Sequence, residues 1–246
     1  MKDSKKQGNS NTTIDFDTER HSGQVRMAFR LAKRFRGRLL HVHGIGWHYW
    51  NGKRWAYDDR GKAFTAVERV LRRAVAESLN NKVLQADVRR CSSSAGMEGV
   101  LKVAAALEPF SATVRDLDAD PYLLNVANGT LDLRTMELRP HDPAYRITKS
   151  CRGAYREVVE SPVWEGFLRY VVPDEDVLGY LHRTAGVGLL GEIREHVLPI
   201  LTGTGANGKT TFDKPLRFAL GDYAIAAEPD LFTPRDGARA ADDGRR

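Results

Sequence analysis

A glycine-rich segment places the strongest constraint on how this chain can fold. Residues 203–210 read GTGANGKT and match the pattern G-x-x-x-x-G-K-[ST], with the fixed positions held by Gly203, Gly208, Lys209 and Thr210. The pattern requires a buried strand before the loop and a helix after it. Both flanks suit this arrangement, because His196–Leu201 is an apolar run of strand length and Thr210–Leu220 can be helical. The segment therefore predicts a strand–loop–helix unit.

A loop of this kind binds phosphate groups. Its glycines let consecutive backbone N–H groups turn inward at the positive end of the following helix. Lys209 would reach the β- and γ-phosphates of a nucleotide, and the hydroxyl of Thr210 would complete the coordination of Mg²⁺. We therefore predict that the chain binds ATP with Mg²⁺ through a run of consecutive residues: Gly203, Thr204, Gly205, Ala206, Asn207, Gly208, Lys209, Thr210 and Thr211.

The rest of an ATPase core is expected to be missing. Hydrolysis needs a second carboxylate at the end of a neighbouring strand, and usually an arginine that stabilises the transition state. After Thr211 no apolar strand ending in Asp or Glu follows, and residues 234–246 contain little to bury beyond alanine. We therefore expect residues 193–246 to form an incomplete α/β P-loop NTPase domain with a disordered end. Such a domain has no complete catalytic set and cannot hydrolyse ATP alone.

Pro215 lies inside the helix that should support the loop. An interior proline removes one hydrogen bond and clashes with the preceding turn, which costs about 3 kcal/mol or kinks the helix. The proline threatens the organisation of the phosphate site more than its chemistry.

The region before the loop predicts a mixed α+β fold. Helices are expected at Gln24–Arg36, Ala63–Leu79 and Met97–Leu107, and strands at Leu39–Val42, Trp47–Trp50, Arg54–Tyr57, Tyr122–Val126, Thr130–Leu133 and Glu137–Arg139. Proline and acidic residues start two further helices, one from Ser161-Pro162 to Val172 and one from Val177 to about Ala185. We predict a disordered tail at 1–22, an α+β accessory domain at 23–150 and a helical connector at 151–192, followed by the incomplete P-loop domain at 193–246.

Basic residues and aromatic residues make single-stranded DNA a possible partner. Helical periodicity places Val25 and five other apolar residues on the inner face of the first helix, and Val75 on the inner face of the second. The first helix turns four cations outward, and Asn51-Gly52 predicts a hairpin that carries further cations among aromatic rings. The candidate DNA contacts are Arg26, Arg30, Lys33, Arg34, Trp50, Lys53 and Arg54. A solvated helix surface and an aromatic core of a small sheet explain the same residues, and we favour the core for the aromatic rings.

Two clusters of possible metal ligands are weaker signals. His41, His43 and His48 lie close in the sequence without a carboxylate or cysteine partner, and we expect no metal there. Asp116, Asp118 and Asp120 alternate, but Pro121 stands where a calcium loop needs glycine. A pair of metal-binding carboxylates stays open, and a capped turn is the favoured interpretation.

Composition excludes some classes of protein. No run approaches the ~20 apolar residues of a membrane helix, and residues 1–20 lack the apolar stretch of a secretory signal. The two cysteines, Cys91 and Cys151, are expected to be free thiols in a reducing compartment, so we predict a cytoplasmic protein. The net charge of +6 is compatible with a nucleic-acid partner without being diagnostic.

Several stretches resemble the phage and plasmid primase–helicase family, which carries a superfamily 3 helicase and a poxvirus- or phage-type primase region. The most specific are ANGTLDLRT and GANGKTT. Others are HVHGIGWHYWNGKRWAYDDRG, VWEGFLRYVVPDEDVLGYLHRTAGVGLLG and LGDYAIAAEPDLF. Together they cover about residues 25–232. The resemblance implies a DNA-replication protein that forms a homo-hexameric ring, binds ATP between subunits and moves along single-stranded DNA.

The resemblance carries over residue by residue only at the phosphate loop. Nothing matches the family's second acidic motif, polar sensor or arginine finger, so the chain is expected to be a truncated helicase. One alternative is a non-enzymatic module that binds single-stranded DNA or a replication partner. A small-molecule kinase is weaker, because no lid or acceptor-site residues follow the loop.

Overall fold

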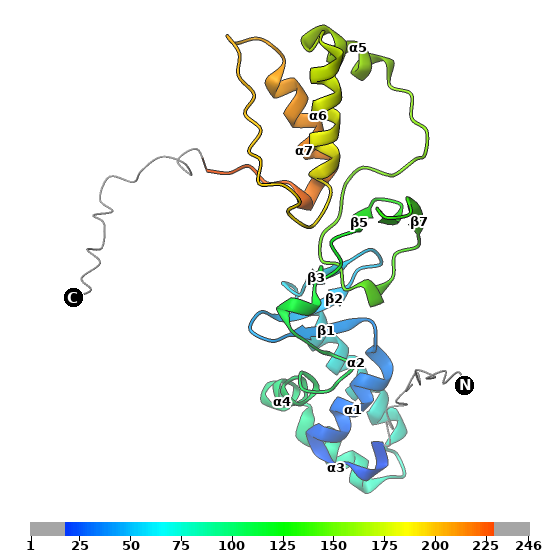
Figure 1. The fold of residues 1–246 in the computed structure, drawn as a ribbon. Helices are drawn as coiled ribbons and strands as arrows, with labels where there is room; N and C mark the ends of the chain where they lie inside the picture. The colour runs from blue at the N-terminus through cyan, green and yellow to red at the C-terminus, as the bar shows by residue number, and fades with distance from the viewer. Residues whose placement is uncertain (1–17, 229–246) are drawn as a thin grey trace, which may run out of the picture. The chain divides into compact units, whose positions relative to one another are not determined.

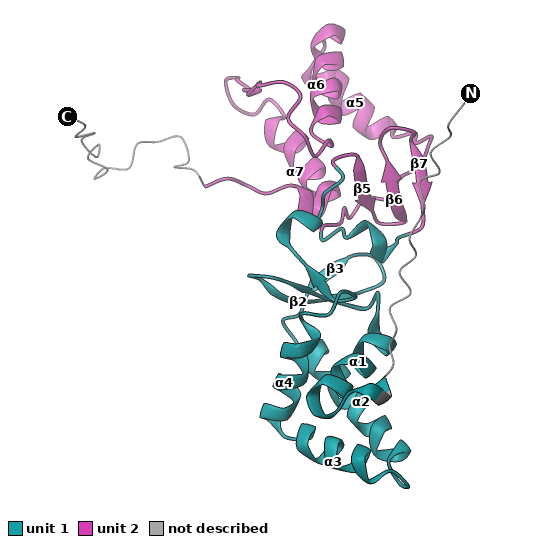
Figure 2. Ribbon diagram, turned by 60° about the horizontal axis from the view of Figure 1, so that its bottom comes forward, with its two compact units in different colours: residues 1–120, 141–148 teal, residues 121–140, 149–246 magenta. Residues whose placement is uncertain are grey.

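The computed structural model describes residues 18–228, and the chain divides into two compact units (Figures 1 and 2). Unit 1 comprises Met1–Asp120 and His141–Thr148, and unit 2 comprises Pro121–Pro140 and Lys149–Arg246. By its contacts, the segment 121–140 therefore belongs with the later part of the chain. The predicted tail from 1 to 17 and the predicted disordered end from 234 lie outside the described residues.

Helices make up most of unit 1. They are α1 (Gly23–Phe35), α2 (Lys62–Glu77), α3 (Lys82–Cys91) and α4 (Ser94–Ala104), with the 3-10 turns η1 (Thr18–Arg20), η2 (Val114–Asp116) and η3 (Pro143–Tyr145). The first two predicted helices are confirmed, and the third is confirmed with both ends about three residues earlier in the chain. Sequence reasoning missed α3, although Asn81 caps it by accepting a hydrogen bond from the backbone N–H of Leu84 at 3.0 Å.

The four helices of unit 1 share one apolar core. Its largest fully buried side chains include Met27, Leu31, Val67, Val100 and Phe110. Two inward predictions are wrong, because Val25 is 37% exposed and Val75 is 51% exposed. Both lie at the margin of the apolar stripe, where the contact with neighbouring helices and not the period decides burial.

Four strands form the sheet of unit 1: β1 (Leu39–Val42), β2 (Gly46–Trp50), β3 (Trp55–Tyr57) and β4 (Ser111–Ala112), in the order β3-β2-β1-β4. The predicted hairpin is confirmed, with Trp50 opposite Trp55. Its turn is the loop 51–54, in which the side chain of Asn51 accepts hydrogen bonds from the backbone N–H groups of Lys53 and Arg54. Arg54 therefore lies in the turn and not in the strand, and the parallel strand β4 was not predicted.

Burial supports the core interpretation of the aromatic hairpin. Trp55 is 3% exposed, and its indole Nε1 donates a hydrogen bond to the carbonyl oxygen of Pro143 at 2.9 Å. Trp47 and Tyr49 pack against the main core of unit 1, while Trp50 packs against the smaller cluster around Trp55. Tyr57 is 55% exposed and contributes little to either.

Unit 2 combines a small sheet with three helices. Its elements are β5 (Leu123–Val126), β6 (Gly129–Asp132), β7 (Glu137–Arg139), α5 (Pro162–Val171), α6 (Glu175–Val187), α7 (Lys209–Leu220) and the 3-10 turn η4 (Gly221–Tyr223), and the strand order is β5-β6-β7. These strands and helices were predicted and are confirmed. Leu124, Val126, Leu131 and Cys151 form the core beneath the sheet, and both cysteines of the chain are buried free thiols, as expected.

Two expectations are wrong in the described residues. His196–Leu201 forms no strand, and Val197, Leu198 and Ile200 are more than half exposed. A central strand needs hydrogen-bonding neighbours, and the strands described between residues 18 and 228 pair with one another in two other sheets. Residues 18–22 are not a disordered tail, because the ring of His21 stacks on Phe29 with centroids 4.3 Å apart. None of the helices between residues 18 and 228 has both the length and the apolar character needed to cross a bilayer.

Candidate functional site

The glycine-rich loop leads directly into the first turn of α7. Gly203, Gly205 and Gly208 have φ angles of 157°, 97° and 83°, and Ala206 has a φ of 48°. Gly208 is the N-cap of α7 in a left-handed conformation, which glycine adopts without steric cost. The backbone N–H groups that follow it lie at the positive end of a helix of 12 residues. The local geometry thus suits a bound anion.

Lys209 folds back over the loop that it follows. Its Nζ donates hydrogen bonds to the side-chain oxygen of Asn207 at 2.6 Å and to the carbonyl oxygen of Gly203 at 3.4 Å. Thr204, Thr210 and Thr211 are exposed. The structure therefore brings the predicted loop residues together, with the ammonium group of Lys209 held above the loop by oxygen acceptors that a phosphate could replace.

Apolar contacts hold the loop against α5. A Cβ atom at Gly208 would lie 2.6 Å from Cγ1 of Val171 and 3.2 Å from the ring of Phe167, so only glycine fits. One turn into α7, Phe212 stacks on Trp164 of α5 with ring centroids 6.1 Å apart. The start of α7 is thereby positioned by tertiary packing as well as by its own cap.

A cavity of about 420 Å³ adjoins the loop. Its lining comes from the end of α5, the start of α6, residues 200–202 and the start of α7: Val171, Val172, Pro173, Asp174, Val177, Leu181, Ile200, Leu201, Thr202, Asn207, Gly208, Lys209 and Phe212. Among these, Asp174 supplies the one carboxylate. It caps α6 by accepting hydrogen bonds from the N–H groups of Asp176 and Val177 at 2.9 and 3.1 Å. Its place beside the loop was not predicted, because the sequence indicates only its role as a helix cap.

The far end of α7 is fastened to the chain that follows β7. The backbone N–H of Arg152 donates to the carbonyl oxygen of Ala219 at 2.8 Å, and Asp222 accepts a hydrogen bond from the N–H of Ser150 at 3.1 Å. The helix continues through Pro215 to Leu220, and Asp213 forms an ion pair with Arg217 at 2.6 Å. This pair joins residues one turn apart on α7.

The ANGTLDLRT stretch contributes to folding, since its Thr130 and Asp132 are buried in the β5–β6 hairpin. Thr130 is 1% exposed and donates a hydrogen bond to Asn125, which is fully buried and whose amide donates to the carbonyl oxygen of Lys149. A Cβ atom at Gly129 would lie 2.4 Å from the carbonyl oxygen of Arg139. Asp132 forms ion pairs with Arg134 and Arg139.

Arg26 is not available for DNA, contrary to the sequence prediction. It is 6% exposed, its Nη1 lies 2.8 Å from Oδ2 of Asp87, and its Nε donates to the carbonyl oxygens of Thr18 and His21. The other oxygen of Asp87 accepts a hydrogen bond from the N–H of Gly23 at 2.7 Å. Arg26 was placed on the outer face because α3, which supplies Asp87, was not predicted.

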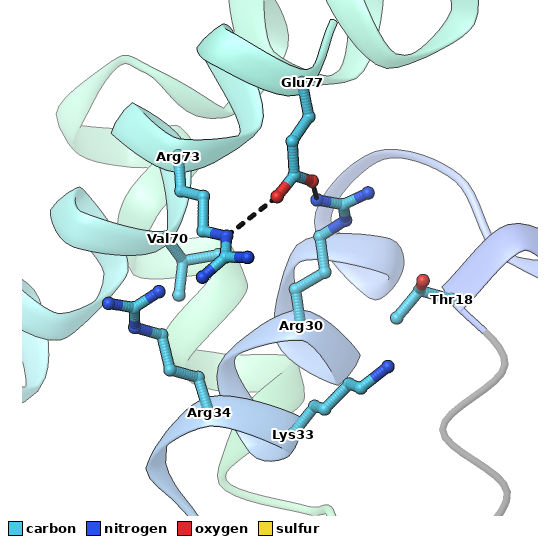
Figure 3. A pocket seen from close by; sticks show the side chains of 7 residues that line it. All are labelled: Thr18, Arg30, Lys33, Arg34, Val70, Arg73 and Glu77. Carbon is cyan, nitrogen blue, oxygen red and sulfur yellow. Dashed lines mark hydrogen bonds and ion pairs between the residues drawn. The ribbon is translucent and has the colours of Figure 1, made fainter.

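The remaining cations of α1 lie beside α2. Arg30 and Arg73 reach Glu77 from the two helices, at 2.5 and 2.8 Å, while Lys33 and Arg34 are exposed (Figure 3). Hydrogen bonds from Arg73 and then Arg30 hold the pKa of Glu77 below its usual value, so this carboxylate stays ionised at neutral pH. Together these residues line a hollow of about 340 Å³.

The hairpin candidates do not join that hollow. Trp50 lines a second one of about 300 Å³, and neither Lys53 nor Arg54 lines either. Arg54 donates a hydrogen bond to the carbonyl oxygen of Thr148 at 2.5 Å. The structure thus separates the seven predicted DNA contacts into a buried arginine, three cations beside α2, one ring in a second hollow and two turn residues.

The possible metal ligands have other contacts. Asp116 accepts hydrogen bonds from the backbone N–H and the hydroxyl of Thr113, which lower its pKa and confirm the capped turn. Asp118 accepts from the N–H of Thr148 at 2.8 Å. The rings of His41 and His43 meet edge to face at 5.2 Å, and burial followed by the neighbouring histidines lowers the pKa of His41. Between residues 18 and 228 no group of three potential ligands converges.

Similarity to known proteins covers more than half of the chain. A family model described as "D5 N terminal like" matches residues 28–173. A protein of Acanthamoeba polyphaga mimivirus with the provisional name helicase L207/L206 is 29% identical over 152 residues, which are 60% of this chain and 16% of that protein. The provisionally named primase C962R of African swine fever virus is 25% identical over 146 residues, covering 55% of this chain and 15% of its own.

A third relative is provisionally named helicase 184R of Invertebrate iridescent virus 6. It is 23% identical over 165 residues, which are 64% of this chain and 17% of that protein. The chain therefore spans about one sixth of the length of the curated relatives that it matches. The residues matched by the family model end before the glycine-rich loop begins.

Proposed function

This chain belongs to the D5 N-terminal-like family, and we propose that within a primase–helicase type of replication protein it binds ATP with Mg²⁺ at residues 203–211. The observation that carries the proposal is the geometry of the loop. Lys209 stands at the start of α7 with its Nζ bonded to the loop oxygens of Asn207 and Gly203, and Gly208 lets the backbone turn inward beneath it. A triphosphate would replace Asn207 and Gly203 as the partner of Lys209 and receive the N–H groups of the first turn.

The residues present fit a magnesium ion and a nucleotide base. Thr210 is exposed on the first turn of α7, where its hydroxyl can serve as a metal ligand. The neighbouring cavity is lined mainly by aliphatic side chains, which suits the flat apolar face of a base. Magnesium would neutralise charge between the phosphates.

We expect binding without turnover by this chain on its own. Asp174 is the carboxylate among the residues that line the cavity. Its Oδ1 accepts hydrogen bonds from the backbone N–H groups of Asp176 and Val177 at the start of α6. A carboxylate engaged in this way is poorly placed to orient an attacking water. Release of phosphate by the pure full chain, lost in Lys209→Ala, would contradict this expectation.

A direct titration tests the nucleotide site. The full chain is titrated with a fluorescent ATP analogue in the presence and absence of Mg²⁺, and Lys209→Ala is compared with Lys214→Ala. Lys214 lies in the same helix, is exposed and does not line the cavity, so it controls for the loss of one positive charge. We expect Lys209→Ala to weaken binding at least about tenfold, the size of one charged hydrogen bond of about 1.5–3 kcal/mol. Equal binding by both variants and the wild type would overturn the proposal.

Binding of single-stranded DNA by unit 1 is a second candidate function. It is favoured by the exposed cations Lys33 and Arg34 beside α2, and by the ring of Trp50 in a hollow that also carries cations. Proteins of this kind combine a positive groove with aromatic stacking, and their affinity falls steeply with salt. Absence of any oligonucleotide binding by the full chain at low salt would exclude this function.

A further inference from the structure

We infer that single-stranded DNA binds unit 1 along the seam between α1 and α2, with its phosphates on the cations of the seam and a base against Trp50. The inference rests on the second candidate function proposed above and gives it a location. It differs from the sequence prediction, because it excludes Arg26 and the hairpin turn and includes cations of α2.

The α2 residues that line the two hollows of unit 1 recur at every turn, so they form a stripe along one face of the helix: Lys62, Thr65, Ala66, Arg69, Val70, Arg73 and Glu77. On α1, Arg34 lines the first hollow and Phe35 lines the second. The two hollows therefore follow the same face of α2, and we take them together as the groove of the seam. From Lys62 to Arg73 the stripe is about 16 Å long, at 1.5 Å per residue.

The first hollow presents four cations around one carboxylate. Arg30, Lys33, Arg34 and Arg73 line it together with Glu77, Thr18 and Val70 (Figure 3). Glu77 holds the guanidinium groups of Arg30 and Arg73 in place, and within residues 18–228 neither Lys33 nor Arg34 forms an ion pair. The hollow therefore keeps an excess of positive charge that can receive a phosphate, and its arginines are oriented before the phosphate arrives.

The second hollow adds aromatic rings and contains no carboxylate in its lining. Four cations line it (Arg38, Arg60, Lys62 and Arg69), together with Tyr49, Trp50, Phe35, Leu39, Thr65 and Ala66. The Nζ of Lys62 lies 5.9 Å from the centre of the Tyr49 ring. In the described part of the chain Arg38 and Arg69 form no ion pair, whereas Arg60 lies 3.9 Å from Asp59.

The rings decide between an unpaired strand and a duplex. Tyr49 and Trp50 are half-buried neighbours in β2, so their side chains leave opposite faces of the sheet: Tyr49 packs against the main core and Trp50 against the cluster around Trp55. Trp50 can therefore offer only its outer part to a ligand. An unpaired base can stack on such a ring, whereas a base inside a duplex is already stacked on both faces. The groove therefore suits a single strand, with phosphates on Arg34, Arg38, Arg69 and Arg73 and a base at the aromatic end.

Fluorescence anisotropy with a labelled thymidine 20-mer tests the location in the full chain. Arg38→Ala and Arg69→Ala each remove one cation of the seam. Arg72→Ala removes a cation of α2 that lines neither hollow and pairs with Glu68. We expect each seam variant to weaken binding about five- to tenfold and to reduce the slope of log K against log salt by about 0.7. Arg72→Ala is expected to bind like the wild type.

A second pair of variants tests the aromatic end. Trp50→Leu removes the stacking ring, and Trp50→Phe keeps one. We expect about tenfold weaker binding for Trp50→Leu and recovery in Trp50→Phe, since stacking on an aromatic ring is worth about 1–3 kcal/mol per base. Circular dichroism checks that both variants fold, and an unlabelled duplex should compete poorly with the labelled strand.

The outcomes separate the location from the function. If the wild type binds and Arg38→Ala, Arg69→Ala and Arg72→Ala all lose affinity equally, the binding is diffuse and the seam is wrong. If Lys53→Ala alone weakens binding, the hairpin turn is the site and the seam is again wrong. If the wild type binds no single strand at low salt, the proposed strand-binding function itself fails.

Discussion

In unit 1 the amphipathic helices close on a shared core, whereas the helices of unit 2 leave most of their large apolar side chains in contact with solvent. Met27, Leu31 and Phe110 are completely buried in unit 1. In unit 2, Tyr170 of α5 is 86% exposed and Phe218 of α7 is 64% exposed, while Leu168 and Leu178 are the buried apolar residues of α5 and α6. The two units therefore hold their candidate sites by different means.

The difference concerns how firmly each site is organised. The α1–α2 seam lies on helices fixed by a continuous core, so its cations are displayed on a rigid surface. The phosphate loop depends on a few contacts, namely Gly208 with α5, Phe212 with Trp164 and the fastening of Ala219 and Asp222. Apolar surface left open in unit 2, above all in residues 197–201, marks a place where further protein could pack.

A matched pair of phenylalanine substitutions should give the largest contrast. Phe110→Ala empties a fully buried position in unit 1 and should lower the free energy of unfolding by about 3–5 kcal/mol. Phe218→Ala makes the same chemical change at an exposed position in unit 2, where the main loss is its contact with Arg152, and should cost less than about 1 kcal/mol. Urea unfolding of the full chain measures both, and equal losses would contradict the difference between the units.

The buried ion pair of unit 1 should come next. Asp87→Ala leaves the guanidinium of Arg26 buried without its carboxylate and should cost about 3 kcal/mol, since a buried charge without its partner is strongly destabilising. Glu68→Ala removes the partner of the exposed Arg72 and should cost about 0.5 kcal/mol. Similar losses for the two variants in urea unfolding would mean that Asp87 adds nothing beyond a surface pair.

Replacing Pro215 should strengthen the weaker unit. Pro215→Ala restores an N–H that can donate to the carbonyl oxygen of Thr211, and should stabilise unit 2 by about 2 kcal/mol, somewhat less than the usual cost of an interior proline. The midpoint temperature of thermal unfolding and the affinity for nucleotide should both rise, because the glycine-rich loop leads directly into α7. Lys214→Ala is the control. If the Pro215→Ala protein is no more stable than the Lys214→Ala protein, α7 tolerates the proline at no cost.

The smallest expected effect is a loss of folding stability at alkaline pH. Burial, and then the charge of Asp222, raise the pKa of Cys151 to about 11, above the value of 9.0 for an unperturbed thiol. A raised pKa in the folded state stabilises the fold fully below about pH 9, and this contribution is lost as the pH rises toward 11. Relative to Cys151→Ala, the free energy of unfolding of the wild type should fall by at most about 1.4 kcal/mol per pH unit in this range.

The control for this dependence lies in unit 1. Burial also raises the pKa of Cys91, so Cys91→Ala compared with the wild type reports the same linkage there. Urea unfolding between pH 8 and 10.5 measures both variants. A difference between wild type and Cys151→Ala that stays constant over this range would show that the thiol of Cys151 ionises as readily in the folded protein as in the unfolded chain.

Local patterns predicted much of the fold and part of the candidate sites. The helices α1, α2, α5, α6 and α7 follow from apolar periodicity, from proline or acidic residues at their starts, and from the glycine that precedes α7. The β2–β3 hairpin follows from Asn51-Gly52 in its turn. The glycine-rich loop was identified as a candidate site because its glycine, lysine and threonine positions lie within eight residues and can be read without any distant partner.

Contacts between residues distant in the sequence decided the features that local patterns did not predict. The outward position of Arg26 in the helical period is correct for an isolated helix, but α3 brings Asp87 onto it and buries both. His196–Leu201 has the composition of a strand and forms none, because backbone pairing needs a neighbour that composition cannot supply. The strand β4 has two residues and is defined only by its pairing with β1.

The sequence by itself determined most of the helices and the pattern of the glycine-rich loop, since helix caps, periodicity and turn residues act over a few positions. Only the tertiary structure decided which charges remain at the surface. It removed Arg26 from the candidate DNA contacts, paired Arg30 and Arg73 through Glu77, and aligned Arg38 and Arg69 with Tyr49 and Trp50 along the α1–α2 seam. The reason is physical: burial and ion pairing depend on what packs against a residue, and residues 26 and 87 meet only when α1 and α3 are both in place.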